Sequence, residues 1–285
     1  MNLYKIKPWL LILPALLFLI LPAYGLWAAF SESIKDGSDV TLTYYHQLFT
    51  SERFLSSLWF SLYTSLTATL ASMIIGIFIT RSFAHFLTDS LPRLSVWLPM
   101  LFPHLVFAYV IILIFSETGW LAQMLTMIGV LESPGEFPIL TRDNYGIGII
   151  LAYIAKEVPF VILMLFPVYN AIPPAYYDVV KTLGGSRMEQ FKTVEWPQIS
   201  TVVMEIFFIL FAFTLTAYEV PAILGTNFPE MVSVLSYDWF YSGSWEDRPL
   251  AFAAMVTISL LITLMAFIGY MYVNRKRMRA LRGRL

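Results

Sequence analysis

Six long apolar segments constrain this chain more than any other feature of its sequence. A helix needs about 20 apolar residues to cross the hydrocarbon core of a bilayer, where no water satisfies backbone polar groups. The segments lie at residues 8–30, 54–80, 95–116, 146–172, 199–225 and 250–273. With 58% hydrophobic and only 13% charged residues, the composition excludes a water-soluble globular protein. The sequence therefore predicts an all-α polytopic membrane protein with six transmembrane helices.

Lysine and arginine are distributed unevenly among the segments between these spans. If the N-terminus is cytoplasmic, the inner segments at 1–7, 81–94, 173–198 and 274–285 carry 13 of the 18 cationic residues, and the outer loops carry four. Short cytoplasmic loops of membrane proteins are enriched in Lys and Arg. We therefore expect both termini to be cytoplasmic. The basic residues at 275–284 predict contact with anionic lipid.

Several kinds of chemistry are excluded by what the sequence lacks. It has no cysteine, and its histidines, His46, His85 and His104, are scattered, so neither a thiolate metal site nor a thiol nucleophile is expected. No Gly-x-x-x-x-Gly-Lys-Ser/Thr phosphate loop is present. We therefore expect a chain that is not an enzyme, has no catalytic residues and binds neither ATP nor metal. A net charge of −1 gives no reason to expect nucleic acid as a partner.

The longest predicted inner loop, residues 173–198, carries signals for two short helices joined by a tight turn. Pro173 and Pro174 suit the start of the first helix. Gly184 and Gly185 permit the left-handed backbone that commonly ends a helix. The loop is therefore expected to begin with a short helix followed by a hinge.

The second helix of this loop is predicted from Ser186 and Glu189, which have the spacing of a capping box. Pro197 is expected to end it, because the residue before a proline is pushed out of the helical region. At the i, i+3, i+4 spacing, shared faces are formed by Tyr177, Val180, Lys181 and Gly184, and by Met188, Phe191 and either Val194 or Glu195. These apolar faces either receive a partner, pack on the spans of the same chain, or lie in the lipid interface.

The loop resembles the signature of the inner-membrane permease subunits of binding-protein-dependent ABC importers. In that signature Glu-Ala-Ala is followed after three residues by Gly and, ten residues beyond this Gly, by Ile-x-Leu-Pro. Here Asp178 stands at the Glu position, Val179 and Val180 at the Ala positions, Gly184 at the Gly, and Val194, Trp196 and Pro197 at the Ile, Leu and Pro positions. Gly184 and Pro197 match in identity, and the other substitutions keep charge sign or apolarity. The order of six spans, with this loop between the fourth and fifth, is also similar.

The resemblance implies a type I ABC importer permease fold, with residues 1–285 forming one transmembrane permease domain. It implies that residues 173–198, here named the coupling loop, sit in a groove of a cytoplasmic ATPase dimer that binds ATP and Mg²⁺. The residues assigned to ATPase contact are Tyr177, Asp178, Val180, Lys181, Gly184, Gly185, Ser186, Met188, Phe191, Val194 and Pro197.

Further partners and a substrate class follow from the same resemblance. It implies a second, different permease chain, an extracytoplasmic solute-binding protein and a location in the bacterial inner membrane. The stretch from Val232 to Ala254 resembles the polyamine branch, near the ferric-iron, thiamine and aminophosphonate branches. A polyamine or another cationic, amine-bearing solute is therefore the expected substrate.

Charged residues at membrane depth are costly and mark a second candidate region. The sequence Glu-Val-Pro occurs at 157–159 and again at 219–221. Each proline cannot donate to the carbonyl four residues earlier, that of Ala155 or Ala217. A bare carbonyl beside a carboxylate predicts a site for a cation or an ammonium group in a discontinuous helix. The residues predicted to line a substrate path are Lys156, Glu157, Pro159, Glu205, Tyr218 and Glu219.

Less specific interpretations remain open for these residues. Lys156 can neutralise one of the acids while the prolines only kink the spans. Glu205 and Glu219 share a face if their helix is continuous, but Glu205 can equally reach lipid headgroups. His104 fits an interior histidine with satisfied hydrogen bonds. A stand-alone carrier coupled to ions or protons is the alternative function, but it would leave the two helices of the coupling loop unexplained.

Overall fold

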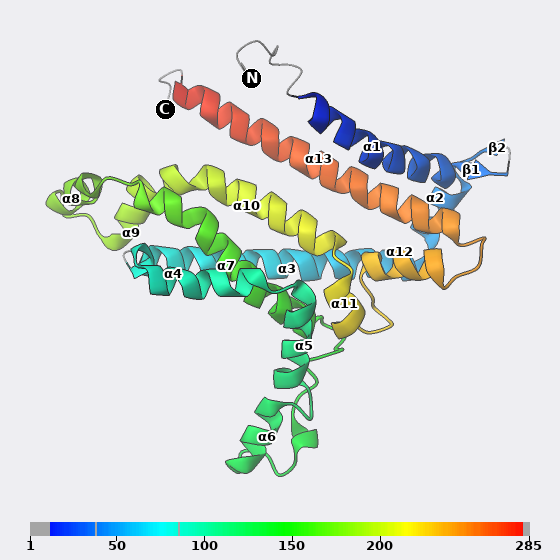
Figure 1. Ribbon diagram of the computed structural model, residues 1–285, viewed down its shortest axis with the longest axis horizontal. Helices are drawn as coiled ribbons and strands as arrows, with labels where there is room; N and C mark the ends of the chain where they lie inside the picture. Colours follow the sequence, from blue (N-terminus) through cyan, green and yellow to red (C-terminus); the bar gives the residue numbers. More distant parts are fainter. Residues whose placement is uncertain (1–11, 38, 85, 282–285) are drawn as a thin grey trace, which may run out of the picture. The chain divides into compact units, whose positions relative to one another are not determined.

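The computed structural model describes residues 12–37, 39–84 and 86–281, with side chains described as far as residue 271. These residues are almost entirely helical (Figure 1). The helices are α1 (Leu13–Ser33), α2 (Thr43–Thr50), α3 (Glu52–Phe83), η3 (Phe86–Thr88), α4 (Ser90–Trp97), η4 (Leu98–Leu101), α5 (His104–Phe115), α6 (Trp120–Met127), η5 (Pro134–Glu136), α7 (Ile147–Asn170), α8 (Pro174–Thr182), α9 (Arg187–Gln190), the π-helix η6 (Phe191–Glu195), α10 (Trp196–Thr216), α11 (Glu219–Leu224), α12 (Val232–Tyr241) and α13 (Arg248–Leu281). The strands β1 (Lys35–Asp36) and β2 (Asp39–Val40) pair antiparallel, with Lys35 opposite Val40.

Six helical segments in the described chain are long and apolar enough to cross a membrane. They are Leu13–Ser33, Glu52–Phe83, His104–Met127, Ile147–Asn170, Arg187–Thr216 and Arg248–Met271. Each overlaps the predicted span of the same rank, which confirms the predicted all-α fold with six spans. The side chains of the basic residues at 275–284 lie outside the described part of the chain.

One compact unit comprises the described residues up to Leu55 together with Leu235–Leu261. Ser33 is the one buried residue of α1, so nearly all of this apolar helix is uncovered within the chain. An all-round apolar surface of this kind fits a helix that faces lipid. Elsewhere in the unit, Arg53 pairs with Asp238 at 3.0 Å.

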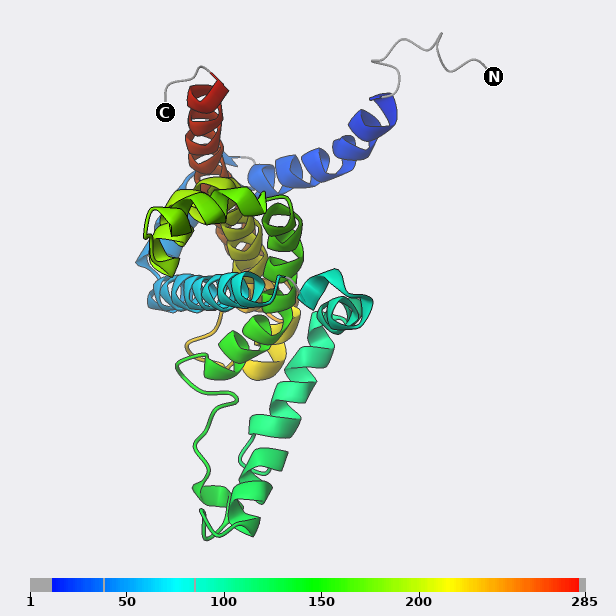
Figure 2. The ribbon, with the colours of Figure 1, turned by 90° about the vertical axis from the view of Figure 1, so that its left-hand side faces the viewer.

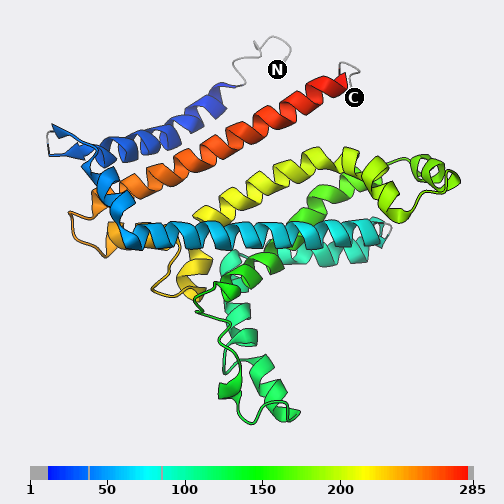
Figure 3. The ribbon, with the colours of Figure 1, turned by 180° about the vertical axis from the view of Figure 1, so that it is seen from behind.

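The second unit, Ser56–Val234 with the described residues from Ile262 onward, is built around α7. One core cluster joins Tyr153 of α7 to side chains of α3, α5 and α11. A second cluster joins Leu165, nearer the end of α7, to side chains of α3 and α10. Figures 2 and 3 show α5 and α6 extending away from the other helices of this unit. The densest packing therefore lies along α7 and leads toward the coupling loop.

Small side chains let α3 approach α7 closely. A Cβ atom added at Gly76 would lie 2.5 Å from Cγ1 of Val161, so the two backbones leave no room for one. Small residues at helix interfaces permit such close approach within membranes. The buried residues of α3 accordingly include the small residues Ser57, Ser61, Thr64, Ser65, Ala68, Thr69 and Ser72.

The predicted third span, 95–116, is wrong at its start. Phe102 is extended, with φ −91° and ψ 141°, and Pro103 caps the new helix α5. The cause is steric, because a proline disfavours helical backbone at the residue before it. On its other side the apolar segment continues through a bend at Gly119 into α6, as far as Met127.

The predicted fifth span, 199–225, is wrong at its end. Helix α10 stops at Thr216, and Ala217 is extended with φ −64° and ψ 136°. The ring of Pro221 would clash with the carbonyl of Ala217 in a continuous helix, so the chain breaks there and restarts as α11. Glu205 and Glu219 therefore do not share a face of one continuous helix.

Candidate functional site

The first helix and the turn of the coupling loop form where the sequence predicts them. Helix α8 begins at Pro174, with Pro173 at its N-cap. Gly184 has φ +77°, a conformation that side-chain-bearing residues rarely adopt. The amide of Gly184 donates to the carbonyl of Lys181 at 2.9 Å, and that of Gly185 to the carbonyl of Val180 at 2.8 Å. The turn thus satisfies carbonyls that the end of α8 would leave unpaired.

The second helix begins as predicted but does not end at Pro197. Ser186 and Glu189 form the reciprocal capping box of α9. The chain then continues through the π-helix η6 directly into α10, with Pro197 near its start. The wider π turn accommodates a proline whose missing N–H and bulky ring a regular α-helix would not tolerate. The coupling loop is therefore joined to the fifth span by helix.

The two faces of the coupling loop meet different surroundings. Val194 is buried in the second core cluster, and Tyr177, Val180 and Phe191 pack against that cluster. These side chains, which we predicted to contact an ATPase, lie against the spans of the same chain. Exposed apolar side chains are instead found at Val179, Leu183 and Met188, 56% to 81% exposed. Asp178, Lys181, Gly184, Ser186 and Pro197 are exposed on the same loop.

Val179 and Leu183 were not among the predicted contact residues. Leu183, at 81% exposed, directly precedes the left-handed Gly184. The position of Leu183 in the sequence is the signal that identifies it. Leu183 is the last residue before the turn that ends the helix, and the packing residues of that helix lie on its opposite face, so Leu183 projects away from the core.

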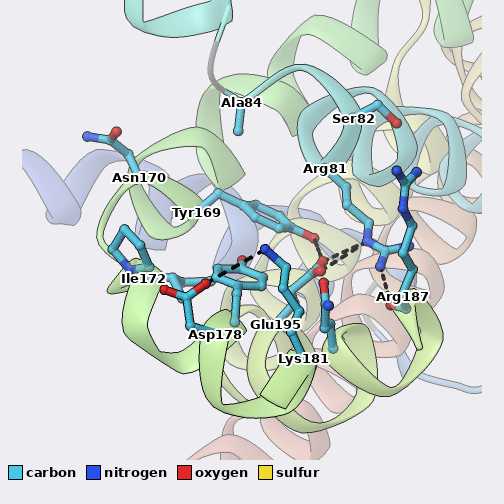
Figure 4. Close-up of a pocket in the computed structure, with 13 residues that line it drawn as sticks. Arg81, Ser82, Ala84, Tyr169, Asn170, Ile172, Asp178, Lys181, Arg187 and Glu195 are labelled. Carbon is cyan, nitrogen blue, oxygen red and sulfur yellow. Dashed lines mark hydrogen bonds and ion pairs between the residues drawn. The ribbon is translucent and has the colours of Figure 1, made fainter. Parts of the chain in front are cut away.

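A buried ion pair, absent from our predicted site, connects the coupling loop with two spans. Glu195 of η6 has a side chain 5% exposed, and Arg81 near the end of α3 donates from Nε to its two carboxylate oxygens at 2.8 and 3.1 Å. The hydroxyl of Tyr169 on α7 donates to the same carboxylate at 3.2 Å. Figure 4 shows Arg81 and Tyr169 pointing toward Glu195 from different elements. We refer to these three residues as the Arg81–Glu195–Tyr169 cluster.

The cluster lines a pocket of about 690 Å³ at this end of the second unit. Its walls also include Tyr177, Asp178 and Arg187 of the coupling loop. Burial, and then the negative charge of Glu195, raise the pKa of the Tyr177 hydroxyl above its ordinary value, so this group stays neutral. Because Asp178 and Arg187 both belong to its walls, the pocket is lined by both signs of charge.

The predicted substrate-path residues Lys156 and Glu157 are both buried, and the hydrogen bonds of their charged groups go to different parts of the chain. Lys156 Nζ donates to the carbonyls of Pro99 and Phe102 at 2.8 and 2.6 Å. The carboxylate of Glu157 lies 2.9 Å from Nε2 of His104. Lys156 thus caps the end of η4, while His104 is the interior histidine with a satisfied hydrogen bond that the sequence suggested.

The two predicted proline breaks differ. Helix α7 runs unbroken through Pro159, so a discontinuous helix at that point is a wrong prediction. The tight packing of α7 against α3, α5 and α10 holds its axis despite the missing hydrogen bond. At the second break the carbonyl of Ala217 is not bare, because the hydroxyl of Ser233 donates to it at 2.8 Å.

The remaining candidates, Glu205, Tyr218 and Glu219, are exposed on the surface of this chain. The structure therefore separates the predicted path into a buried pair of charged residues on α7 and outward-facing residues on α10 and α11. In the part of the chain that the structure describes, no group of three or more His, Asp or Glu residues is placed to hold a metal ion.

Comparison with known proteins gives a family match over most of the chain. The family described as "Binding-protein-dependent transport system inner membrane component" matches residues 72–279. The thiamine transport system permease protein ThiP of Brucella suis biovar 1 (strain 1330) is 25% identical over 210 residues. That match covers 72% of this chain but 37% of ThiP, so the chain spans little more than a third of that relative.

A relative of similar length and a solved structure extend the comparison. The trehalose/maltose transport system permease protein MalF of Thermococcus litoralis is 24% identical, and the match covers 94% of both chains. A chain in the crystal structure of a bacterial ABC transporter involved in import of the acidic polysaccharide alginate superposes with a TM-score of 0.73 and 18% identity, covering 94% of both chains. At that identity the structural match concerns the fold.

Proposed function

This chain belongs to the family of binding-protein-dependent transport system inner membrane components, and we propose that it acts as a permease subunit of an ATP-driven ABC importer. Its coupling loop is the docking surface for a cytoplasmic ATPase dimer, which binds ATP and Mg²⁺. A second, different permease chain completes the path, and an extracytoplasmic solute-binding protein delivers the solute.

The exposed half of the coupling loop is the observation that supports this proposal. Val179, Leu183 and Met188 expose apolar surface beside the charged Asp178 and Lys181. The opposite half of the loop packs on the core. A partner that covers these apolar side chains gains hydrophobic burial, and it meets a surface held in place from behind.

Outward-facing carboxylates favour a path shared with another permease chain. Glu205 lies within the fifth span and is exposed on α10. Glu219 follows the break after α10 and is also exposed. A carboxylate in contact with hydrocarbon is costly, so this face is covered by protein or lines a water-filled path.

A cationic, amine-bearing solute such as a polyamine is the substrate class that we propose. Carboxylates on the path stabilise a passing ammonium group electrostatically, and Glu205, Tyr218 and Glu219 are the candidates for this role. Lys156 and Glu157 have protein partners and support the path from behind.

Purification from the native membrane tests the proposal. The chain is tagged, extracted in mild detergent, and the proteins that co-purify in stoichiometric amount are identified by mass spectrometry. We expect an ATPase and a second permease chain. A chain that purifies alone and moves solute in vesicles without ATP would instead be a stand-alone carrier. In reconstituted vesicles, uptake of spermidine and putrescine is compared with uptake of thiamine and sulfate. Preference for sulfate, an anion, overturns the cationic substrate class, and preference for thiamine, which is itself a cation, overturns the assignment to polyamines within that class.

A pair of leucine variants tests the docking surface itself. Leu183→Glu places a charge on the exposed apolar side of the coupling loop, and we expect it to abolish co-purification of the ATPase. Leu91→Glu on α4 is the matched control, because Leu91 is 77% exposed and Leu183 is 81% exposed. Equal retention of the ATPase by both variants contradicts docking at the coupling loop.

A further inference from the structure

The Arg81–Glu195–Tyr169 cluster lies at the junction between the coupling loop and the spans. Glu195 is the last residue of the π-helix η6, directly before α10. Arg81 belongs to the last turn of α3, and Tyr169 lies one residue before the end of α7. One carboxylate therefore connects three helices whose residues are separated by 26 to 114 positions in sequence.

Arg81 holds the second helix of the coupling loop at both of its ends. Besides the contacts with Glu195, its Nη2 donates to the carbonyl of Arg187, the first residue of α9, at 2.6 Å. Its guanidinium carbon lies 5.0 Å from the ring centroid of Phe191, which follows α9. A guanidinium presents several donors in one rigid plane, so one side chain can satisfy partners in different directions.

Burial makes these contacts mutually dependent. The carboxylate of Glu195 is almost fully removed from solvent, and a buried charge is tolerated only where it is paired and hydrogen-bonded. By contrast, the pair between Asp178 and Lys181 on α8 spans 3.7 Å with both side chains largely exposed. Exposed pairs contribute little. Of these two pairs, the buried one therefore fixes the position of the loop.

We infer that Arg81, Glu195 and Tyr169 are positioning residues that fasten the coupling loop to α3 and α7, so that a displacement of the loop displaces these spans. The inference rests on the proposed function, in which an ATPase displaces the loop. Losing the cluster leaves the docking surface exposed but loosens its connection to the path. ATP hydrolysis then continues with less transport.

The test uses the whole complex in vesicles and measures solute transported per ATP hydrolysed. Glu195→Gln and Arg81→Met are expected to keep the ATPase bound and to lower this ratio about tenfold, the result of losing a contact of roughly 1.4 kcal/mol in the step that links hydrolysis to transport. Tyr169→Phe removes one hydroxyl and is expected to lower the ratio less. Arg93→Met is the matched control, an exposed arginine on α4 outside the cluster, and should leave the ratio unchanged.

The exchanged pair Arg81→Glu with Glu195→Arg separates the specific role from general damage. We expect this double variant to transport more solute per ATP hydrolysed than the single variants do, because it returns opposite charges to the same positions. If single variants lower yield, thermal stability and all activities in parallel while the ratio stays at the wild-type value, the inference is overturned. If the wild-type chain retains no ATPase at all, the proposed function fails, and this result is distinct from an unchanged ratio.

Discussion

A single lysine side chain closes the broken end of η4. Lys156 is 3% exposed and donates to two carbonyls, those of Pro99 and Phe102. We predict that Lys156→Met lowers the thermal unfolding temperature of the purified protein by several degrees. The reason is that it removes two hydrogen bonds from a charged donor, each worth about 1.5–3 kcal/mol. Thermal unfolding in detergent, followed by a dye that reports exposed surface, measures this effect.

Two comparison variants accompany the lysine experiment. Lys181→Met makes the same substitution at an exposed site whose ion pair is long, 3.7 Å, and should leave the unfolding temperature unchanged. Lys156→Arg keeps donors within reach and should recover part of the loss. Identical unfolding temperatures for Lys156→Met and the wild type would show that these hydrogen bonds contribute nothing to stability.

Gly184 and Gly129 offer a second test at a single residue. Both have positive φ, +77° and +74°, and an added Cβ atom would meet nothing within 4 Å at either position. Substitution by Asp therefore imposes a similar backbone strain, about 1–2 kcal/mol, at each. We predict that Gly184→Asp abolishes substrate-stimulated ATP hydrolysis by the complex while Gly129→Asp, outside the coupling loop, leaves it intact. Equal effects of the two would assign the loss to strain and not to the coupling loop.

At the residue scale, local features could be predicted from the sequence, but contacts between residues distant in sequence could not. The capping box of Ser186 and Glu189 and the left-handed Gly184 depend on neighbours within four residues, so spacing alone predicts them. The contact between Arg81 and Glu195 joins positions 114 residues apart. A charge count assigns Arg81 to a cytoplasmic loop, but only the packing of α3 beside η6 identifies its partner.

At the scale of elements, the approach of α3 to α7 depends on one glycine. We predict that Gly76→Ala destabilises the protein by about 1–3 kcal/mol, because its Cβ would lie 2.5 Å from Val161. Val161→Gly removes both atoms that are struck, Cγ1 at 2.5 Å and Cβ at 2.6 Å, so Gly76→Ala combined with Val161→Gly should be less destabilised than the sum of the single variants. A double-mutant cycle of unfolding free energies measures this coupling. If the changes in unfolding free energy of the two single variants add strictly in the double variant, the helices separate freely.

Hydropathy located the six spans, but it did not locate their ends. Hydropathy alone predicts that the helices continue through residues 95–103 and 217–225, although prolines interrupt both segments. At Pro197 the opposite error arises. The proline was expected to end a helix, but a π turn precedes it and the helix continues. Proline imposes a fixed local cost, and the surrounding packing decides whether the chain breaks or adapts.

For the whole molecule, the absence of cysteine makes the predicted orientation directly measurable. The natural sequence contains no cysteine, so a single introduced thiol reports its own location. We predict that Ser133→Cys, in an outer loop, reacts with a membrane-impermeant maleimide in intact cells, and that Thr182→Cys, in the coupling loop, reacts only after the membrane is permeabilised. The reverse pattern would place both termini outside the cytoplasm.

The continuous helix from Arg187 to Thr216 has a mechanical consequence. Its 30 residues extend about 45 Å, longer than the roughly 30 Å of the hydrocarbon core. No loop intervenes between its two ends. A tilt of about 5° at one end would move the other end by about 4 Å, given that length. Under the proposed function, this helix would act as a lever arm, turning a small rotation at the end that carries the coupling loop into a movement comparable to the width of a small solute.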